Sequence, residues 1–399
     1  MVLPTAYLSE LCALVQETEP ELWNFFASAP RTSALVEEVR ANLLRSAYRL
    51  DDSVHVDVLE AAALAAESLG LDDPVTLYQA QDGGGGYGNA ACLSIPGQVH
   101  VVFSGATLSL LDGDELVAVM GHELAHHVLW SLDGGAYWIL DRLVHASAED
   151  LGARASHEET ARLLRLNTEL VADRGAHLAV DGDTSVTISA LVKLATGLST
   201  VSGEAYLRQS EEILAAAQEG VGPSSHPETY VRAWALARWV AEGEGAEEAI
   251  SRQLTGTRTL NTLDLVAQHR LTELSQRLVR QWLEPAWSRT DPLLAHAKAF
   301  GGLAVPRGRG KVPAPVTATE LASWGTEVGD YVSYVLLDLA TVDGEVAEPA
   351  MAASLVLSDE LGLPKPFDAI VRKELGITVK DLRDRRTAAP ALLVTAATS

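Results

Sequence analysis

The sequence predicts a mostly helical α+β protein, on three observations. The chain has 399 residues, of which 47% are hydrophobic and 21% are charged, and this ordinary balance allows a sizeable buried core. The helix formers Ala, Leu and Glu are abundant, whereas aromatic residues make up only 6%. Apolar residues recur at helical spacing over most of the chain, and short β-like runs interrupt this pattern only between residues 75 and 105.

The first third of the chain contains the predicted strands. Residues 1–50 are expected to be helical, and a second amphipathic helix is expected over Val54–Leu69. The run VTLYQ is typical of a strand, and ACLSIPGQVHVVFSG is typical of two short strands around a Pro-Gly turn. The following run, LSLLDGDELVAVMGHELAHHVLW, predicts a long helix with Asp112 or Asp114 as its N-cap.

The rest of the chain predicts further helices in two groups. Almost every segment from about 136 to 300 has a helical pattern. Residues 301–316, GGLAVPRGRGKVPAPV, are rich in Gly, Pro and basic residues and lack any period, which is typical of a linker. We therefore expect an N-terminal helical segment at 1–50, a main domain at 51–300, and a small helical domain at 317–399 after the linker.

The net charge of −24 argues against nucleic acid as a partner, because a chain this acidic is repelled by phosphate. The N-terminus lacks the basic region of a signal peptide, and no stretch has the roughly 18 uninterrupted apolar residues of a membrane span. Two distant cysteines without a CxxC motif indicate free thiols, with a disulfide as the alternative. We expect a soluble cytoplasmic protein, and secretion without a signal peptide stays open.

The most informative motif is HELAH at residues 122–126, which matches HExxH. A helix turns about 100° per residue, so His122 and His126 share one face and can both reach one zinc ion. Glu123 is offset around the helix and can act on a water molecule without binding the metal. The alternative is an amphipathic helix that happens to carry two histidines. His127 points about 100° away from His126 and is predicted to be no ligand.

A catalytic zinc needs a third protein ligand and an open fourth position. The segment RLNTELVADRGAHLAV offers Glu169 and Asp173, which are four residues apart and share a helical face. Glu169 is predicted to bind the zinc, and Asp173 to orient a ligand histidine through a hydrogen bond. The alternative for such a pair is a solvated helix face. The pattern predicts one zinc ion per chain.

A third segment, SSHPETYVRAWALARW, places His226 before a proline at a helix start, with Arg232 six residues later. A histidine in this position is commonly a capping or surface residue. Beside a zinc site it can instead donate a hydrogen bond to the oxyanion that develops during peptide hydrolysis.

In combination these motifs resemble the CAAX prenyl protease and HtpX-like gluzincin family, over roughly residues 55–240. Asn89-Ala90 before a strand is similar to the family's edge-strand region. The resemblance implies a gluzincin-type metallopeptidase domain with a helical extension at 51–300, built on a zincin fold with a small sheet and a long zinc helix. It implies zinc ligation by His122, His126 and Glu169, base catalysis by Glu123, support of the ligands by Asp173, oxyanion stabilisation by His226, and anchoring of that segment by Arg232.

The predicted function is that of a zinc-dependent metalloendopeptidase, in which Glu123 acts as general base on a zinc-activated water. A protein or peptide substrate is expected to lie in extended form near Val99–Phe103 as an added strand. The alternative is a non-catalytic or latent metal-stabilised helical scaffold for protein–protein interaction. Glu123 favours the enzyme, because a purely structural zinc site needs no base and closes its fourth position.

The C-terminal segment LLDLATVDGEVAEPAMAASLVLSDELGLP resembles the TerB-like helical domain, whose helix hairpin carries a similar D-G-E turn. The resemblance implies a regulatory or docking module. We therefore expect a protein partner to bind through the domain at 317–399. An EF-hand is not expected, because the segment lacks the oxygen-rich loop of 12 residues that binds calcium.

Overall fold

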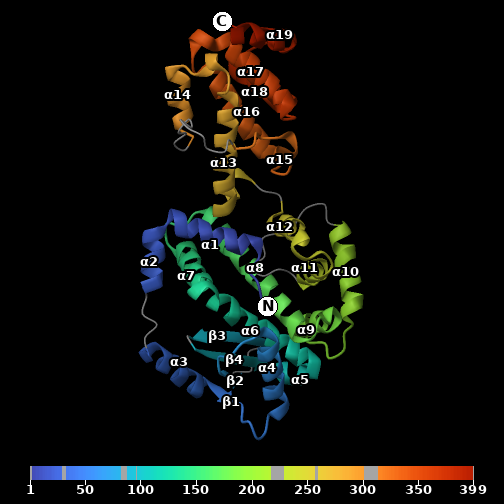
Figure 1. Cartoon of the computed structure of the whole chain (residues 1–399). Coiled ribbons are helices and arrows are strands. Elements are labelled where there is room, and N and C mark those ends of the chain that lie inside the picture. Colours follow the sequence, from blue (N-terminus) through green and yellow to red (C-terminus); the bar gives the residue numbers. More distant parts are fainter. Residues whose placement is uncertain are drawn as a thin grey trace. The chain divides into compact units, whose positions relative to one another are not determined.

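The structure is a computed structural model in which the chain forms two compact units, Met1–Gly256 and Thr257–Ser399 (Figure 1). The predicted class is confirmed: the fold is α+β and mostly helical, with one small four-stranded sheet. The structure describes residues 2–28, 33–81, 88–95, 97–216, 229–256, 259–300 and 313–398.

The sheet lies in the first unit and has the strand order β1-β2-β4-β3. Strand β4 is internal: it pairs in parallel with β2 and antiparallel with β3. Its side chains Val99, Val101 and Phe103 are fully buried, as expected for a central strand. Strand β1 lies within the segment predicted to be helical, and its three residues are too few to show a period. The strands are β1 Ala47–Arg49, β2 Val75–Ala80, β3 Gly88–Ile95 and β4 Gln98–Gly105.

The first unit also contains helices, and the helix predicted over Val54–Leu69 is confirmed as α4, which ends at Gly70 in a left-handed conformation with φ 66°. Its helices are α1 Ala6–Thr18, α2 Pro20–Ser28, α3 Ser33–Ser46, α4 Val56–Leu69, α5 Thr107–Leu110, α6 Gly113–Ser131, α7 Ala136–Glu149, α8 Ala155–Ala179, α9 Thr184–Thr196, α10 Gly203–Ala216, α11 Thr229–Glu242 and α12 Glu247–Thr255.

Helix α6 begins with a capping box, which fixes its start at Gly113. The Asp112 side chain accepts a hydrogen bond from the Glu115 backbone at 3.0 Å, and the Glu115 carboxylate accepts one from the Asp112 backbone at 3.0 Å. Of the two predicted candidates, Asp112 is therefore the N-cap of α6. The residues before it form the separate short helix α5, so the long helix begins later than the apolar pattern predicts.

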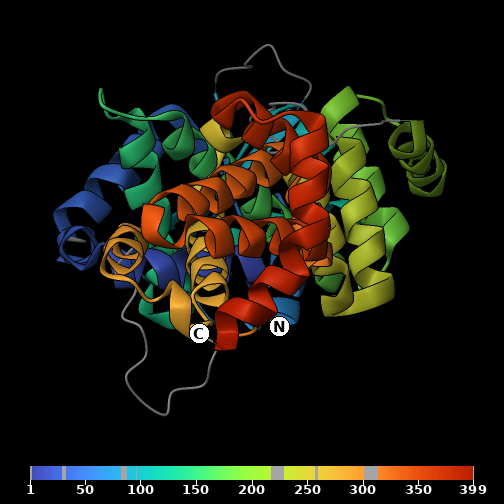
Figure 2. The ribbon, with the colours of Figure 1, turned by 90° about the horizontal axis from the view of Figure 1, so that it is seen from above.

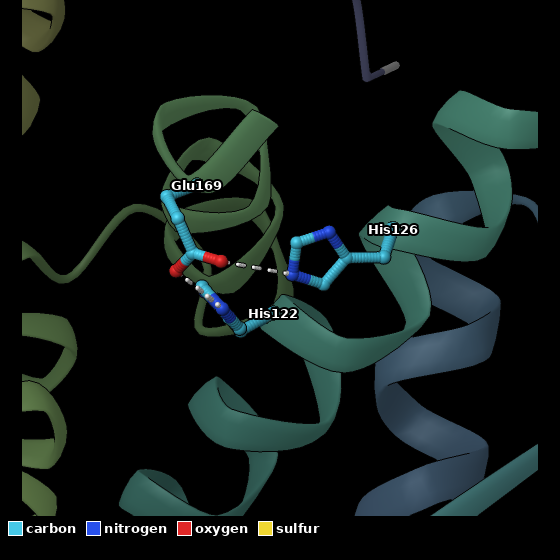
Figure 3. A group of neighbouring side chains, drawn as sticks. All are labelled: His122, His126 and Glu169. Carbon is cyan, nitrogen blue, oxygen red and sulfur yellow. Dashed lines mark ion pairs between the residues drawn. The ribbon is translucent and has the colours of Figure 1, made fainter. Parts of the chain in front are cut away.

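Helices α6 and α8 cross at small residues, which lets their backbones approach closely. A Cβ atom added to Gly175 of α8 would lie 2.2 Å from the Cβ atom of Ala125 on α6 and 3.0 Å from the Gly121 carbonyl oxygen. This close crossing sets how far the side chains of one helix stand from those of the other. Figure 3 shows the result: His122 and His126 of α6 point toward Glu169 of α8.

We expect the substitution Gly175→Ala to destabilise the first unit by about 1–3 kcal/mol, because the new methyl group forces two packed helices apart. Thermal unfolding measures this effect. Gly113→Ala, at the start of α6, is the matched control, since nothing lies within 4 Å of a Cβ atom at that position. Equal unfolding temperatures for the two variants would contradict the close crossing.

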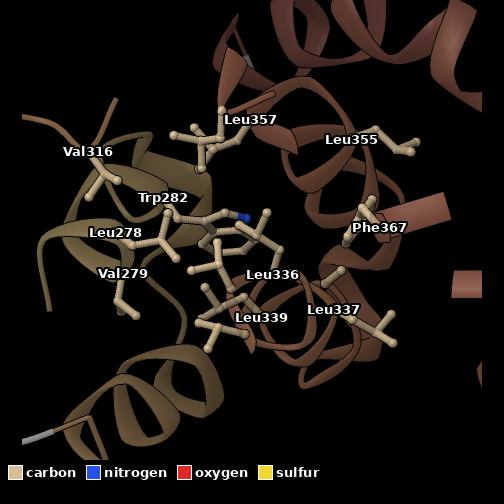
Figure 4. Close-up of a cluster of buried hydrophobic side chains, with 14 of the residues drawn as sticks. Leu278, Val279, Trp282, Val316, Leu336, Leu337, Leu339, Leu355, Leu357 and Phe367 are labelled. Atoms are coloured by element: carbon tan, nitrogen blue, oxygen red, sulfur yellow. The ribbon is translucent and has the colours of Figure 1, made fainter. Parts of the chain in front are cut away.

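The second unit is a helical bundle with its own core (Figures 1 and 2, yellow to red). Trp282 of α13 lies among Leu336 and Leu339 of α16, and its indole nitrogen donates to Ser354 Oγ at 2.9 Å (Figure 4). Its helices are α13 Leu265–Trp282, α14 Asp291–Lys298, α15 Ala318–Ala322, α16 Thr326–Thr341, α17 Ala347–Glu360, α18 Pro364–Leu375 and α19 Val379–Thr398.

The sequence placed residues up to 300 with the main domain, whereas helices α13 and α14 pack in the second unit. Of the predicted linker, residues 301–312 lie outside the described part of the chain. The D-G-E turn at Asp343 joins α16 to α17 through the 3₁₀ turn Gly344–Val346, as a helix hairpin requires. The TerB-like resemblance of this unit stays a prediction.

Two further expectations concern the thiols and the membrane. Cys12 and Cys92 are both free, and burial together with the charge of Asp133 raises the pKa of Cys12 to about 11. This thiol is therefore protonated at neutral pH and a poor nucleophile. Among the residues that the structure describes, no helix is long and apolar enough to cross a membrane.

Candidate metal centre

Three side chains that the sequence predicted as zinc ligands converge in the first unit. His122 Nε2 lies 3.5 Å from Glu169 Oε2, and His126 Nε2 lies 3.7 Å from Glu169 Oε1. One potential ligand atom from each of the three residues lies within 4.8 Å of the other two (Figure 3). The two histidines come from successive turns of α6, and the carboxylate comes from α8. Their convergence follows from the close crossing of these helices.

The donor set fits a zinc ion. Tetrahedral zinc with ligands at about 2.0–2.2 Å requires ligand atoms that are roughly 3.3–3.5 Å apart. The observed separations of 3.5 and 3.7 Å are close to this requirement. Two imidazole nitrogens and one carboxylate oxygen are also the donor types of a catalytic zinc site, which keeps one position open.

Asp173 and Arg232 support two of the predicted ligands, His122 and Glu169, through their side chains. Asp173 is 1% exposed, and its Oδ1 atom lies 3.1 Å from His122 Nδ1. Arg232 donates from Nε to Asp173 Oδ2 at 2.8 Å, and its Nη1 lies 3.2 Å from Glu169 Oε2. With its Nδ1 proton donated to Asp173, the His122 ring is oriented so that Nε2 faces Glu169. The Arg232 guanidinium therefore holds both acids, Asp173 and Glu169, in place.

Comparison with known proteins supports this chemistry. Residues 57–131 match the model of peptidase family M48. The matched segment runs from α4 through the strands β2, β3 and β4 to the end of α6, so it includes His122, Glu123 and His126. Metallopeptidases of family M48 generally use zinc. No curated protein and no solved structure matches the chain.

Within the M48-like segment, Trp130 orients the second histidine in a different way. The His126 ring stacks on the Trp130 indole with ring centres 5.5 Å apart and an angle of 27° between the planes. Among the described residues, His126 Nδ1 has no hydrogen-bond partner. The His126 ring is therefore held by aromatic packing, whereas the His122 ring is held by a hydrogen bond to Asp173. The sequence analysis missed Trp130, although its spacing of four residues from His126 on one helix was the available signal.

The electrostatics of the cluster keep its acids ionised and its two histidines unequal. Burial disfavours the charged form of His122, but the hydrogen bonds that its ring donates to Asp173 and Glu169 outweigh this and raise its pKa to about 10. Burial and the neighbouring His122 lower the pKa of His126 to about 4. Burial would raise the pKa of Glu169, but the Arg232 charge and the histidines hold it well below its usual range. A metal ion held at Nε2 of His122 would therefore displace a proton.

Glu123 has the environment of a proton-transfer group. Its side chain is 7% exposed and lines the same cavity as the three predicted ligands. Burial is the main cause that raises the pKa of its carboxyl above the ordinary value, and the negative charge of Glu169 acts in the same direction. A carboxylate with a raised pKa is a stronger base and returns its proton at a pH closer to neutral.

A cavity of about 590 Å³ lies over the cluster. Its walls include Asn89, Ala90 and Cys92 of strand β3. The predicted substrate position at Val99–Phe103 is wrong, because β4 pairs with a strand on each side and has no free backbone edge. Strand β3 is an edge of the sheet and borders the cavity.

One predicted site residue, His226, lies outside the residues that the structure describes. Arg232, from the same predicted segment, lies on α11 and contacts both Asp173 and Glu169. The roles of His226, Asp173 and Arg232 in a reaction stay predictions. His127, predicted to be no ligand, is absent from the cluster of potential ligands among the described residues.

Proposed function

We propose that the chain is a zinc-dependent metalloendopeptidase, with His122, His126 and Glu169 as the ligands of one zinc ion. The observation that carries this proposal is the convergence of these three side chains at an open cavity, with the buried Glu123 beside them. The match of residues 57–131 to peptidase family M48 supports the peptidase class independently of this geometry. A structural metal site does not need a buried base next to its ligands.

Glu123 would move the proton in this reaction. His122, His126 and Glu169 would hold the zinc ion, which would lower the pKa of water toward about 7 and polarise the carbonyl group of the substrate. Glu123 accepts a proton from the attacking water and delivers it to the leaving amine. Asp173 keeps the proton on His122 Nδ1, and Arg232 offsets the negative charge of Asp173 and Glu169. His226 is proposed as the donor to the developing oxyanion.

The substrate is proposed to be a protein segment in extended form, added to the sheet at β3. The backbone groups on the free side of an edge strand can pair with a peptide, and this binds main chain with little sequence selectivity. Residues 89–92 of β3 border the cavity, so a peptide paired there passes over the metal ligands. The second unit contains the segment that resembles a TerB-like domain. This unit is proposed as a docking module for a protein partner.

The alternative is a non-catalytic or latent metal-stabilised scaffold. The position of Glu123 in an open cavity favours the enzyme, because a scaffold gains nothing from a buried carboxylate with a raised pKa.

Metal analysis combined with cleavage of unfolded casein tests the proposal. We expect about one zinc per chain, cleavage that stops after zinc is chelated, and recovery when zinc is added back. Calcium added at the same concentration is the control, because a site with two imidazoles disfavours it. A zinc-loaded protein that leaves casein and other unfolded proteins intact would favour the scaffold.

A further inference from the structure

The histidine that follows the predicted ligand His126 makes two hydrogen bonds away from the metal. His127 is 1% exposed. Its Nδ1 atom lies 2.7 Å from Ser94 Oγ, and its Nε2 atom lies 2.9 Å from Asp73 Oδ2. Ser94 belongs to the edge strand β3, and Asp73 belongs to the segment between α4 and β2. His127 thus links three parts of the M48-like segment.

The chemistry of the three groups fixes the direction of each hydrogen bond. An ionised carboxylate only accepts, so the Nε2 proton of His127 is donated to Asp73. In the neutral ring Nδ1 is then an acceptor, and it receives the Ser94 hydroxyl proton. Both ring nitrogens have a partner, and the ring itself is buried, whereas the Asp73 side chain is 37% exposed. The ring therefore has one orientation and holds the Ser94 side chain against α6.

Strand β3 needs such a contact because, among the described residues, a strand holds only one of its sides. Its ladder with β4 fixes that side, and the other side borders the cavity. Along β3, Ala90, Cys92 and Ser94 are less exposed than the residues between them, so they share the covered face. Ser94 is the hydroxyl-bearing residue of this set and bonds to the helix that carries the metal ligands.

The contact lies next to the proposed base. Cys92, two residues before Ser94, forms a backbone hydrogen bond with the Glu123 carboxylate. Ser94 and His127 make the next contact between the strand and α6, one helical turn beyond Glu123. Movement of β3 along or away from α6 would therefore change the distance between a strand-bound peptide and Glu123.

Serine, histidine and aspartate also form the triad of serine hydrolases, so this alternative must be weighed. A triad histidine passes a proton to the leaving group of the substrate, which requires access to the ring. The His127 ring is 1% exposed and does not line the cavity. This burial favours a positioning role over nucleophilic catalysis.

We propose that His127 is a positioning residue that clamps the edge strand β3 to the metal-binding helix α6 through Ser94 and Asp73, and so sets the register between a strand-bound peptide and the catalytic groups. The inference rests on the proposed function for its catalytic consequence. The clamp itself is a property of the folded chain and can be measured without any substrate.

The variant Ser94→Ala tests the clamp, because it removes one hydroxyl group with little change in volume. We expect amide hydrogen exchange across residues 88–95 to become roughly 2–10-fold faster, as the loss of one hydrogen bond implies. With the zinc-loaded protein, KM for an extended peptide should rise by a similar factor, while zinc content stays as in the wild type. Ser94→Thr, which keeps the hydroxyl, should restore both readouts.

Ser68→Ala is the matched control, because the Ser68 hydroxyl is exposed and donates, within the described part of the chain, to the Leu64 carbonyl oxygen of its own helix α4. Unchanged exchange in β3 of Ser94→Ala would overturn the clamp. Labelling of Ser94 by a fluorophosphonate probe would overturn it in favour of a nucleophile. If the wild type fails to cleave any peptide, the proposed function fails, and the exchange measurement still decides whether the clamp exists.

Discussion

Replacing Glu123 with glutamine is expected to lower the cleavage rate by roughly 10²–10⁴-fold, while the protein keeps its full zinc content. Glutamine has nearly the same shape as glutamate, so the helix packing around this buried side chain is preserved. It cannot accept a proton from water at neutral pH, and so it cannot deliver one to the leaving amine. The measurement is kcat for an unfolded protein substrate, together with zinc per chain by elemental analysis.

The control for this variant is Glu158→Gln, an exposed glutamate in the first turn of α8. It makes the same chemical change away from the cavity and should cleave like the wild type. Equal cleavage by Glu123→Gln and the wild type would show that Glu123 is not the base. Loss of both zinc and cleavage would instead mean that Glu123 contributes to metal binding or to folding of the site.

Local sequence patterns predicted the parts of the site that depend on one helix. The HExxH spacing placed two histidines on one face of α6, and Asp112 was one of the two residues predicted to begin that helix. Glu169 could be proposed because an acid pair spaced four residues apart faces one way from a helix. That the two faces meet depends on Gly121 and Gly175, whose role is visible only in the crossing of α6 and α8.

Other parts of the site could not be predicted, because they depend on which distant segments pair. The strand order β1-β2-β4-β3 makes β4 internal, and a pattern of alternating residues does not distinguish a central strand from an edge strand. The bonds of His127 join residues that are 33 and 54 positions away in the sequence. No motif of fixed spacing links these residues, so the sequence supported only the statement that His127 is no ligand.

The boundary between the two units also depends on which distant segments pack together, and the sequence did not predict it. Helix α13 has an apolar face, and the sequence assigned it to the main domain because the Gly- and Pro-rich segment follows it. In the structure α13 belongs to the second unit, and that face, with Trp282, packs in the core of this unit. An amphipathic pattern specifies that a helix is covered on one side, but it does not specify the partner.

Replacing Glu169 with alanine is expected to weaken zinc binding more than 100-fold. Loss of an outer partner of a ligand typically costs about 10–100-fold in metal affinity, and this change removes a proposed ligand itself. It also removes the carboxylate that lies 3.2 Å from Arg232 Nη1. The guanidinium then faces the two histidines with less compensation, and its positive charge opposes a divalent cation. Competition with a chelating dye measures the affinity.

Two comparisons separate these contributions. Glu158→Ala, on an exposed face of the same helix, should bind zinc like the wild type. Glu169→Gln keeps an oxygen donor but loses the negative charge, so its affinity should lie between those of the wild type and the alanine variant. If Glu169→Ala binds zinc as tightly as the wild type, another group supplies the third ligand. Excess zinc should restore cleavage to Glu169→Gln but not to Glu123→Gln, because only the first variant has an intact base.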